Sequence, residues 1–154
     1  MSIEEKIRSL GITVPKPAKP MGAYVPALVV NDLVFTSGQG PLVEGEIKYR
    51  GKLGRDITQE NGYQAAKLAA LNCLSAIKSE IGDLDKIERI VKVTGYVNSA
   101  EGFTKQPLVL NGASELLQNI FGEKGKHARS AIGVNELPND ISVEVEIIAK
   151  LKTA

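Results

Sequence analysis

Two neighbouring stretches decide the fold of this chain: Ala128-Arg129-Ser130-Ala131-Ile132-Gly133-Val134 and Ile141-Ser142-Val143-Glu144-Val145-Glu146-Ile147-Ile148-Ala149. Both are rich in β-forming residues, and the segment Leu137-Pro138-Asn139-Asp140 between them has the composition of a turn. Together they predict a β-hairpin. The second stretch alternates, so Ile141, Val143, Val145 and Ile147 share one face, and Ser142, Glu144, Glu146 and Ile148 share the other.

The two strands carry charges that suit chemistry on a small carboxylate. Arg129 opens the first strand, and a guanidinium grips a carboxylate with two parallel hydrogen bonds at any working pH. Glu144 lies within the second strand, where a carboxylate can orient a water or move a proton. The alternative is that both side chains are solvated or form a surface ion pair, which is the ordinary fate of charges on strands.

Length and composition favour an ordinary globular domain. The chain has 154 residues, which predicts a single domain, 1–154, with residues 1–20 as an N-terminal lead. The formal net charge is +1, so the bulk charge does not favour nucleic acid or an anionic membrane as a partner.

Cysteine usage and hydropathy favour a cytoplasmic protein. Cys73 is the one cysteine, so no intrachain disulfide can form, which fits a reducing compartment. No apolar run approaches the roughly 20 residues of a membrane span. The first residues are acidic where a secretory signal has an apolar stretch, so no such signal is expected.

Hydrophobic periodicity and turn residues predict an α+β order. Helices are expected at residues 3–10, at about 58–81 with Thr58 as the cap and Gly82 as the stop, and at about 106–121. Strands are expected at 24–30, 33–37, 87–97 and in the two stretches quoted above, with a small turn or strand in 43–50. This order lacks strict βαβ alternation, so we expect the helices to pack on one face of a sheet.

Named catalytic motifs are absent: there is no phosphate-binding loop, zinc spacing or nucleophile elbow. Ser37-Gly38-Gln39-Gly40 is glycine-rich, yet no helix follows it directly. It is either a flexible strand end, or a place where the Ser37 hydroxyl and the Gly38 backbone amide meet a ligand.

Four single residues need individual interpretation. Cys73, in a run of Ala and Leu, is expected to be a buried small hydrophobe rather than a nucleophile, and His127 is expected at the surface. Asn111 either faces solvent or points its amide into a cleft to hold the arginine or a ligand. Tyr24 is either core or a cleft wall that presents its hydroxyl.

Taken together, these segments resemble the RidA/YjgF family, also called L-PSP endoribonucleases. The segments that carry the resemblance are Gly22-Ala23-Tyr24-Val25, Val34 to Gln39, Ile90 to Thr94, Asn111 to Glu115, and Ala128-Arg129-Ser130 through Leu137-Pro138 to Glu146. They span nearly the whole chain after residue 20 in the family's order. The long N-terminal lead and Gly-Lys-His-Ala-Arg are similar to a longer branch of the family.

The resemblance implies a chorismate-mutase-like fold, with two helices on one face of a mixed, mostly antiparallel sheet, and a homotrimer with ligand clefts between subunits. It implies hydrolysis of reactive enamines and imines, such as 2-aminoacrylate and 2-iminopropanoate, to the 2-keto acid and ammonia, without cofactor or metal. Carried over by position, Arg129 binds the substrate carboxylate. Glu144, which the resemblance places near Arg129 across the hairpin, orients the attacking water or moves a proton. Tyr24, Ser37, Gly38 and Asn111 then line the cleft.

One departure and two alternatives accompany this hypothesis. Where many members have Cys two residues after the arginine, this chain has Ala131. An endoribonuclease that inhibits translation is one alternative, although no basic groove with interleaved aromatics is evident and RNA is not favoured as a partner. The other is a trimeric binder of small carboxylates without turnover. The preferred imine stays open.

Overall fold

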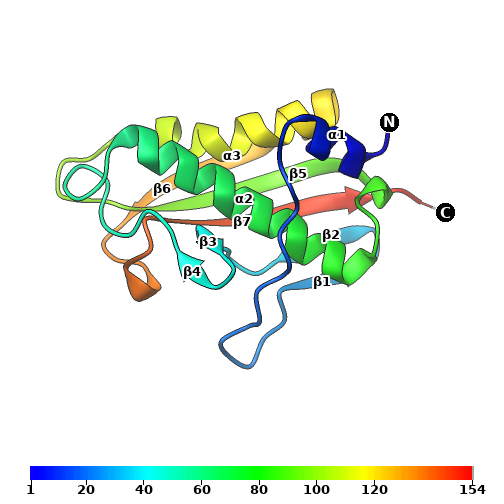
Figure 1. Ribbon diagram of the computed structural model, residues 1–154, viewed down its shortest axis with the longest axis horizontal. Coiled ribbons are helices and arrows are strands. Elements are labelled where there is room, and N and C mark those ends of the chain that lie inside the picture. Colours follow the sequence, from blue (N-terminus) through cyan, green and yellow to red (C-terminus); the bar gives the residue numbers. More distant parts are fainter. Residues whose placement is uncertain (154) are drawn as a thin grey trace.

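Two long helices lie across one face of a five-stranded sheet in the computed structural model, which describes residues 1–153 (Figure 1). In chain order the helices and strands are α1 (Ile3–Ser9), β1 (Ala27–Val30), β2 (Leu33–Thr36), β3 (Leu42–Val43), β4 (Glu46–Ile47), α2 (Gln59–Ile81), β5 (Ile87–Asn98), α3 (Gln106–Phe121), β6 (Ala128–Val134) and β7 (Val143–Leu151). The predicted α+β class is confirmed.

The expected hairpin between the two deciding stretches is wrong. The sheet order is β1-β2-β7-β5-β6, so β5 lies between β6 and β7. β6 pairs with β5 in parallel, with Arg129 opposite Val93, and β7 pairs with β5 antiparallel, with Glu144 opposite Tyr96. Alternation reports which face of a strand is buried and does not report which strand is its neighbour. The segment between the strands therefore steps across β5.

The helix boundaries follow their capping residues. The Thr58 hydroxyl accepts a hydrogen bond from the Asn61 backbone N–H at 3.1 Å, and α2 ends at Gly82 with φ of 86°. α3 carries Pro107 in its first turn and ends at Gly122 with φ of 62°. Both predicted helices are confirmed to within a residue of their expected ends.

Glycines let α2, α3 and the sheet approach closely. A Cβ at Gly112 of α3 would lie 2.0 Å from the Tyr63 carbonyl oxygen of α2, so any other residue there would push the helices apart. A Cβ at Gly95 of β5 would lie 2.0 Å from a methyl of Leu110, whose side chain covers that glycine. These contacts fix α3 above the β5–β6 side of the sheet, where it meets Arg129.

The N-terminal lead is anchored over the helical layer rather than on the sheet. α1 begins with a capping box between Ser2 and Glu5, and its Ile7 is buried. The Ile3 backbone N–H donates to Asp85 at 2.6 Å, and Ser75 of α2 donates to the Pro15 carbonyl at 2.5 Å. The chain then descends to the sheet, and β1 begins at Ala27, after the predicted start at residue 24.

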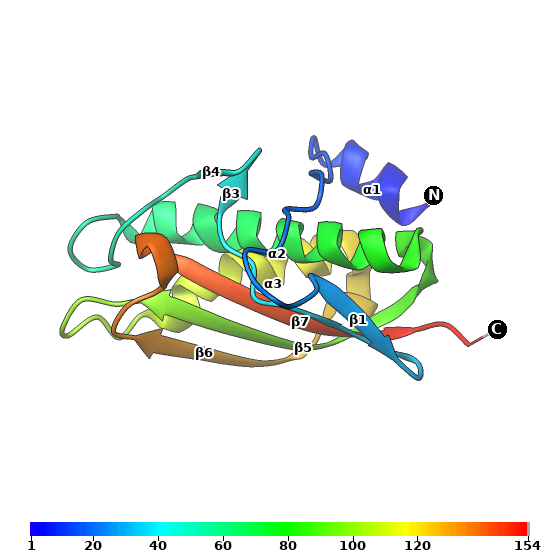
Figure 2. The same cartoon turned by 90° about the horizontal axis from the view of Figure 1, so that it is seen from below.

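The two faces of the sheet differ. Among residues 1–153, Figure 2 shows the helices on one side of the sheet and no helix or strand across the other. The helical side holds the core, including the buried Val93, Val143, Val145 and Ile147. On the open side, Leu28, Val30 and Ile132 are 44%, 49% and 43% exposed, since they alternate away from the core. No helix among residues 1–153 is long and apolar enough to cross a bilayer.

Candidate functional site

Arg129 is held at one end by α3. Its Nη1 donates to Asn111 Oδ1 at 2.9 Å and to Ser114 Oγ at 3.1 Å. Asn111 and Ser114 are three residues apart on one helix and therefore present their side chains on the same face. The hypothesis that Asn111 holds the arginine is confirmed. Ser114 was not predicted from the sequence, where its i+3 spacing from Asn111 was the available signal.

The other side of the Arg129 guanidinium is open. Within residues 1–153, neither Nε nor Nη2 makes a hydrogen bond or an ion pair with the protein. The side chain is half-buried, so these donors are partly shielded from bulk water. A guanidinium fixed through one nitrogen, with the adjacent pair of donors unused, suits a carboxylate bound in bidentate fashion.

His127 belongs to the same network, contrary to its expected surface role. Its Nε2 lies 2.9 Å from Ser114 Oγ, and its Nδ1 lies 2.7 Å from the Gly125 carbonyl oxygen. Burial lowers the pKa of His127, the hydrogen bond to Gly125 raises it, and the Arg129 charge lowers it. The ring is half-buried because β6 brings it beneath α3, a placement that depends on pairing with β5 and leaves no local pattern.

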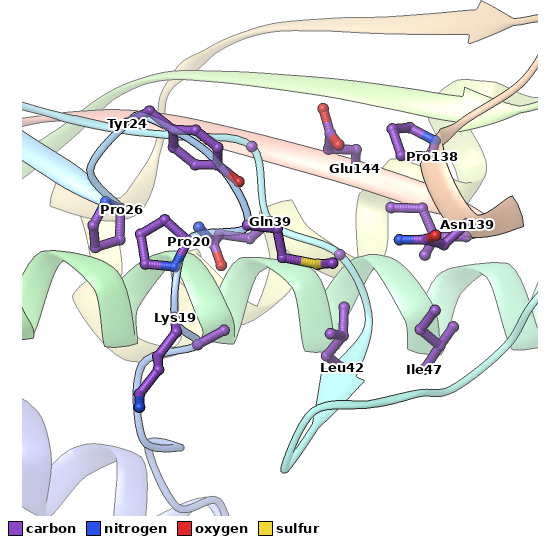
Figure 3. Close-up of a pocket in the computed structure, with 15 residues that line it drawn as sticks. Lys19, Pro20, Tyr24, Pro26, Gln39, Leu42, Ile47, Pro138, Asn139 and Glu144 are labelled. Atoms are coloured by element: carbon purple, nitrogen blue, oxygen red, sulfur yellow. The ribbon is translucent and has the colours of Figure 1, made fainter.

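Glu144 lines a separate cavity of about 280 Å³, shown in Figure 3. Tyr24 and Gly38 also line it, so the structure brings three of the predicted site residues together. In Figure 3 the Tyr24 ring and the Glu144 carboxylate flank the same space. Burial raises the pKa of Glu144, and the nearby Glu146 carboxylate raises it further.

Gly38 determines where the Glu144 carboxylate lies. A Cβ at position 38 would lie 2.5 Å from Glu144 Oε2 and 2.7 Å from its Cδ. The Glu144 side chain, and not a ligand, occupies the space beside the Gly38 backbone, so a role of the Gly38 amide in binding a ligand stays a prediction. Ser37 does not line this cavity, and its hydroxyl donates to the Val25 carbonyl at 2.5 Å.

Much of the remaining cavity wall is apolar and was not predicted from the sequence. The segment Ala18 to Met21 of the N-terminal lead forms one side of the cavity. The prolines of the lead predicted an extended segment but not its direction. The apolar lining side chains are Pro20, Met21, Pro26, Leu42, Ile47, Pro138 and Ile141.

Arg129 and Glu144 do not meet within one chain. Arg129 pairs with the buried Val93 and points to the helical side of the sheet, whereas Glu144 alternates to the other side beside Tyr96. The expectation that they lie close across a hairpin is wrong, because β5 separates their strands. The described chain thus carries two separate groups of candidate residues, one with Arg129 and Asn111, the other with Tyr24, Gly38 and Glu144.

The remaining candidates are structural. The Cys73 thiol is fully buried, and burial raises its pKa to about 12, so the prediction of an inert cysteine is confirmed. Glu146 accepts a hydrogen bond from the Tyr96 hydroxyl at 2.7 Å, which raises the pKa of Tyr96. No group of acidic, His or Cys side chains in the described part of the chain is arranged to hold a metal ion.

Comparisons with known proteins cover nearly the whole chain. A family profile described as "YjgF/chorismate mutase-like, putative endoribonuclease" matches residues 4–151. Protein TCP17 of Trypanosoma cruzi is 38% identical over 97% of this chain and 94% of its own length. Protein Atu1372 of Agrobacterium tumefaciens, whose crystal structure is described as having unknown function, shares 40% identity and a TM-score of 0.91 over 97% of this chain and 92% of that one.

Two further matches bear on activity. A structure from Shewanella oneidensis MR-1, named as a candidate endoribonuclease, has a TM-score of 0.95 and 34% identity over 98% of this chain and all of that one. A Dermatophagoides farinae protein named 2-iminobutanoate/2-iminopropanoate deaminase is 29% identical over 92% of this chain and 95% of its own length. The observed order of helices and strands is thus a chorismate-mutase-like fold.

Proposed function

This chain belongs to the YjgF/RidA family, and on that basis we propose that it is a cofactor-free hydrolase of small 2-imino acids and their enamine tautomers. The reaction adds water to the imine carbon and releases ammonia and the 2-keto acid. The observation that carries the proposal is Arg129, whose Nη1 is fixed by Asn111 while Nε and Nη2 are open to a substrate carboxylate. The deaminase name of the Dermatophagoides farinae relative supports the same chemistry.

A complete site requires a second copy of the chain, so the proposal includes a homotrimer with clefts between subunits. Arg129 and Glu144 face opposite sides of one sheet, and only a neighbouring subunit can bring a Glu144 to this Arg129. The open sheet face, with Leu28, Val30 and Ile132 exposed, offers an apolar surface to that neighbour. Burial of this surface would drive the assembly.

In such a cleft Arg129 of one subunit and Glu144 of another have different roles. Arg129 binds the carboxylate and fixes the orientation of the imine, which is the larger part of the task, because protonated imines react with water unaided. Glu144 from the second subunit holds the attacking water and takes its proton, and the proton then leaves with ammonia. Tyr24 and Gly38 line the cavity beside Glu144, and its apolar wall would contact the substrate side chain.

A direct assay supplies the imine enzymatically. A pyridoxal-phosphate dehydratase acts on serine or threonine in the presence of an amine trap that competes with water for the imine. The protein should lower the amount of trapped imine and raise the initial rate of 2-keto acid and ammonia release. Unchanged partitioning at protein concentrations equal to the dehydratase would contradict the proposed activity.

The description of the family also suggests an endoribonuclease, and a separate experiment tests this alternative. A labelled single-stranded RNA is incubated with the same preparation after two further purification steps. Cleavage that survives these steps, without imine hydrolysis, would favour the ribonuclease. Carboxylate binding with neither activity would favour the non-catalytic binder.

A further inference from the structure

A continuous line of hydrogen bonds runs from the backbone to the guanidinium of Arg129. The Gly125 carbonyl oxygen lies 2.7 Å from His127 Nδ1, and His127 Nε2 lies 2.9 Å from Ser114 Oγ. Ser114 Oγ in turn lies 3.1 Å from Arg129 Nη1. The mechanism proposed above does not use His127 or Ser114, yet both are in contact, directly or through one atom, with the carboxylate-binding group.

The direction of every bond in this line follows from its first member. A carbonyl oxygen only accepts, so His127 Nδ1 carries a proton and donates to Gly125. In the neutral ring, Nε2 then has a free lone pair and accepts the Ser114 hydroxyl proton. The Ser114 oxygen keeps its own lone pairs, and one of them accepts from Arg129. With neutral His127 in its Nδ1–H form, every proton in the line therefore has an acceptor.

The anchor of the line is rigid. Gly125 ends the 3-10 turn Gly122–Gly125 and is buried against α3. A Cβ at Gly125 would lie 2.3 Å from the Leu117 carbonyl oxygen, so the turn is seated directly on the helix backbone. Ser114 is 7% exposed on the same helix. Both ends of the His127 ring are thus fixed to α3, and the ring cannot shift without breaking a buried contact.

We propose that His127 and Ser114 are positioning residues that hold Arg129 ready for the substrate carboxylate, and that the titration of His127 reports whether that carboxylate is bound. The proposal rests on the carboxylate-binding role of Arg129 given above. Asn111 alone would fix one direction of the guanidinium, and the second acceptor on the same Nη1 fixes its plane. A fixed plane leaves Nε and Nη2 aimed at one place.

The charges around His127 determine whether ligand binding raises or lowers its pKa. Burial is the main cause that lowers the pKa of His127, and the positive charge of Arg129, two residues further along the chain at the start of β6, lowers it as well. Of the neighbouring groups, Lys126 is paired with Glu123 at 2.9 Å, and Arg89 of β5 donates to the Lys126 carbonyl at 2.9 Å. A carboxylate bound to Arg129 cancels the charge that disfavours imidazolium, so ligand binding should raise the pKa of His127.

NMR of the imidazole nitrogens tests this on the intact protein, because His127 is the only histidine. The neutral ring should show a protonated Nδ1 and an unprotonated Nε2. Saturation with pyruvate should raise the measured pKa by roughly 0.3–1 pH unit, and Arg129→Met should raise it without ligand and abolish the pyruvate effect. An Nε2–H form, or a pKa unmoved by pyruvate that demonstrably binds, would overturn the proposal.

Variants of His127 separate positioning from simple structural support. His127→Phe keeps the ring but offers Ser114 no acceptor, so KM should rise about tenfold while kcat stays within about twofold. His127→Gln places an amide oxygen where it can accept from Ser114, and it should recover most of the loss. The matched control is Ser79→Ala, which removes a helix serine bonded only to the Ala76 carbonyl and should change neither constant.

The positioning role of His127 and the proposed imine hydrolysis can be contradicted independently of each other. If His127→Gln and His127→Phe are equally impaired, the line of hydrogen bonds does not position Arg129, regardless of which substrate the enzyme hydrolyses. If imine turnover is absent altogether, the proposed function fails, and the tautomer together with the Arg129→Met shift still decides whether the hydrogen-bonded line exists in solution.

Discussion

Gly38 and Glu144 touch so closely that a Cβ at position 38 would lie 2.5 Å from the carboxylate oxygen Oε2. Gly38 has no left-handed backbone conformation, so the close approach and not the torsion angle is what requires glycine there. The contact comes from opposite ends of the chain, since one residue follows β2 and the other lies on β7. It fixes which way the proposed water-binding carboxylate points.

Gly38→Ala should therefore impair turnover more than it impairs folding. The added methyl forces the Glu144 side chain to another rotamer, and we expect kcat to fall by roughly 10²-fold with an unfolding free energy within about 1 kcal/mol of the parent. Steady-state kinetics and thermal unfolding measure the two effects. Gly45→Ala is the control for a methyl added in open space; its left-handed backbone (φ of 79°) should lower stability but leave kcat unchanged, so an equal fall of kcat in both variants would contradict the prediction.

Arg129→Lys should not support carboxylate binding. An ammonium cannot present the planar fork, so the loss should amount to about 2–5 kcal/mol, close to that of complete removal. Calorimetry with pyruvate measures the affinity. Arg89→Lys is the matched control, because Arg89 contacts only backbone carbonyls. A lysine variant at position 129 with full affinity would remove Arg129 from the site.

Glu144→Gln should abolish turnover and spare binding. The amide keeps the shape of the carboxylate but not its basicity, so kcat should fall by roughly 10²–10⁴ with little change in pyruvate affinity. Glu146→Gln, two residues along the same face, should turn over like the parent at neutral pH. Indistinguishable kinetics for Glu144→Gln and Glu146→Gln would contradict a catalytic role for Glu144.

The acidic limb of the pH–rate profile should depend on Glu146. Burial and Glu146 both raise the pKa of Glu144, so ionised Glu144 and turnover are lost as the pH falls through a value above the usual 4.5. Glu146→Gln removes the neighbouring negative charge and should move the limb of kcat downward by roughly 0.3–1 pH unit. A limb that stays in place would show that another group controls it.

Assembly should depend on the open sheet face. The parent should sediment as three copies of the 16.5 kDa chain, and Ile132→Glu should dissociate it by placing a charge on the proposed interface. Leu108→Glu is the control, since Leu108 is similarly exposed at 46% but lies on α3, in the helical layer. A monomeric parent at micromolar concentration would exclude a shared cleft.

Local signals in the sequence predict the elements of this fold well. Thr58 and Gly82 define α2, and the alternation of residues 141–148 correctly separates the buried face of β7 from the face with Glu144. These signals act within a few residues and need no knowledge of the rest of the molecule. The Asn111–Arg129 contact was one of the two alternatives that the sequence left open for Asn111.

The sequence pattern does not predict which distant strands pair with each other. The same alternation fits a β7 beside β6 and a β7 beside β5, and the choice depends on hydrogen bonds between strands far apart in the chain. His127 was misplaced for the same reason, since its burial follows from the position of β6 under α3. The apolar wall from residues 18–21 depends likewise on where an extended lead comes to rest.

The placement of Arg129 and Glu144 on opposite faces of one sheet has a consequence for heredity. If each cleft takes one residue from each of two chains, a chain lacking Arg129 and a chain lacking Glu144 are both inactive alone. Mixed assemblies of the two contain some clefts with both groups intact. Two null alleles would then complement each other in one cell, and the unit on which selection acts would be the interface rather than the polypeptide.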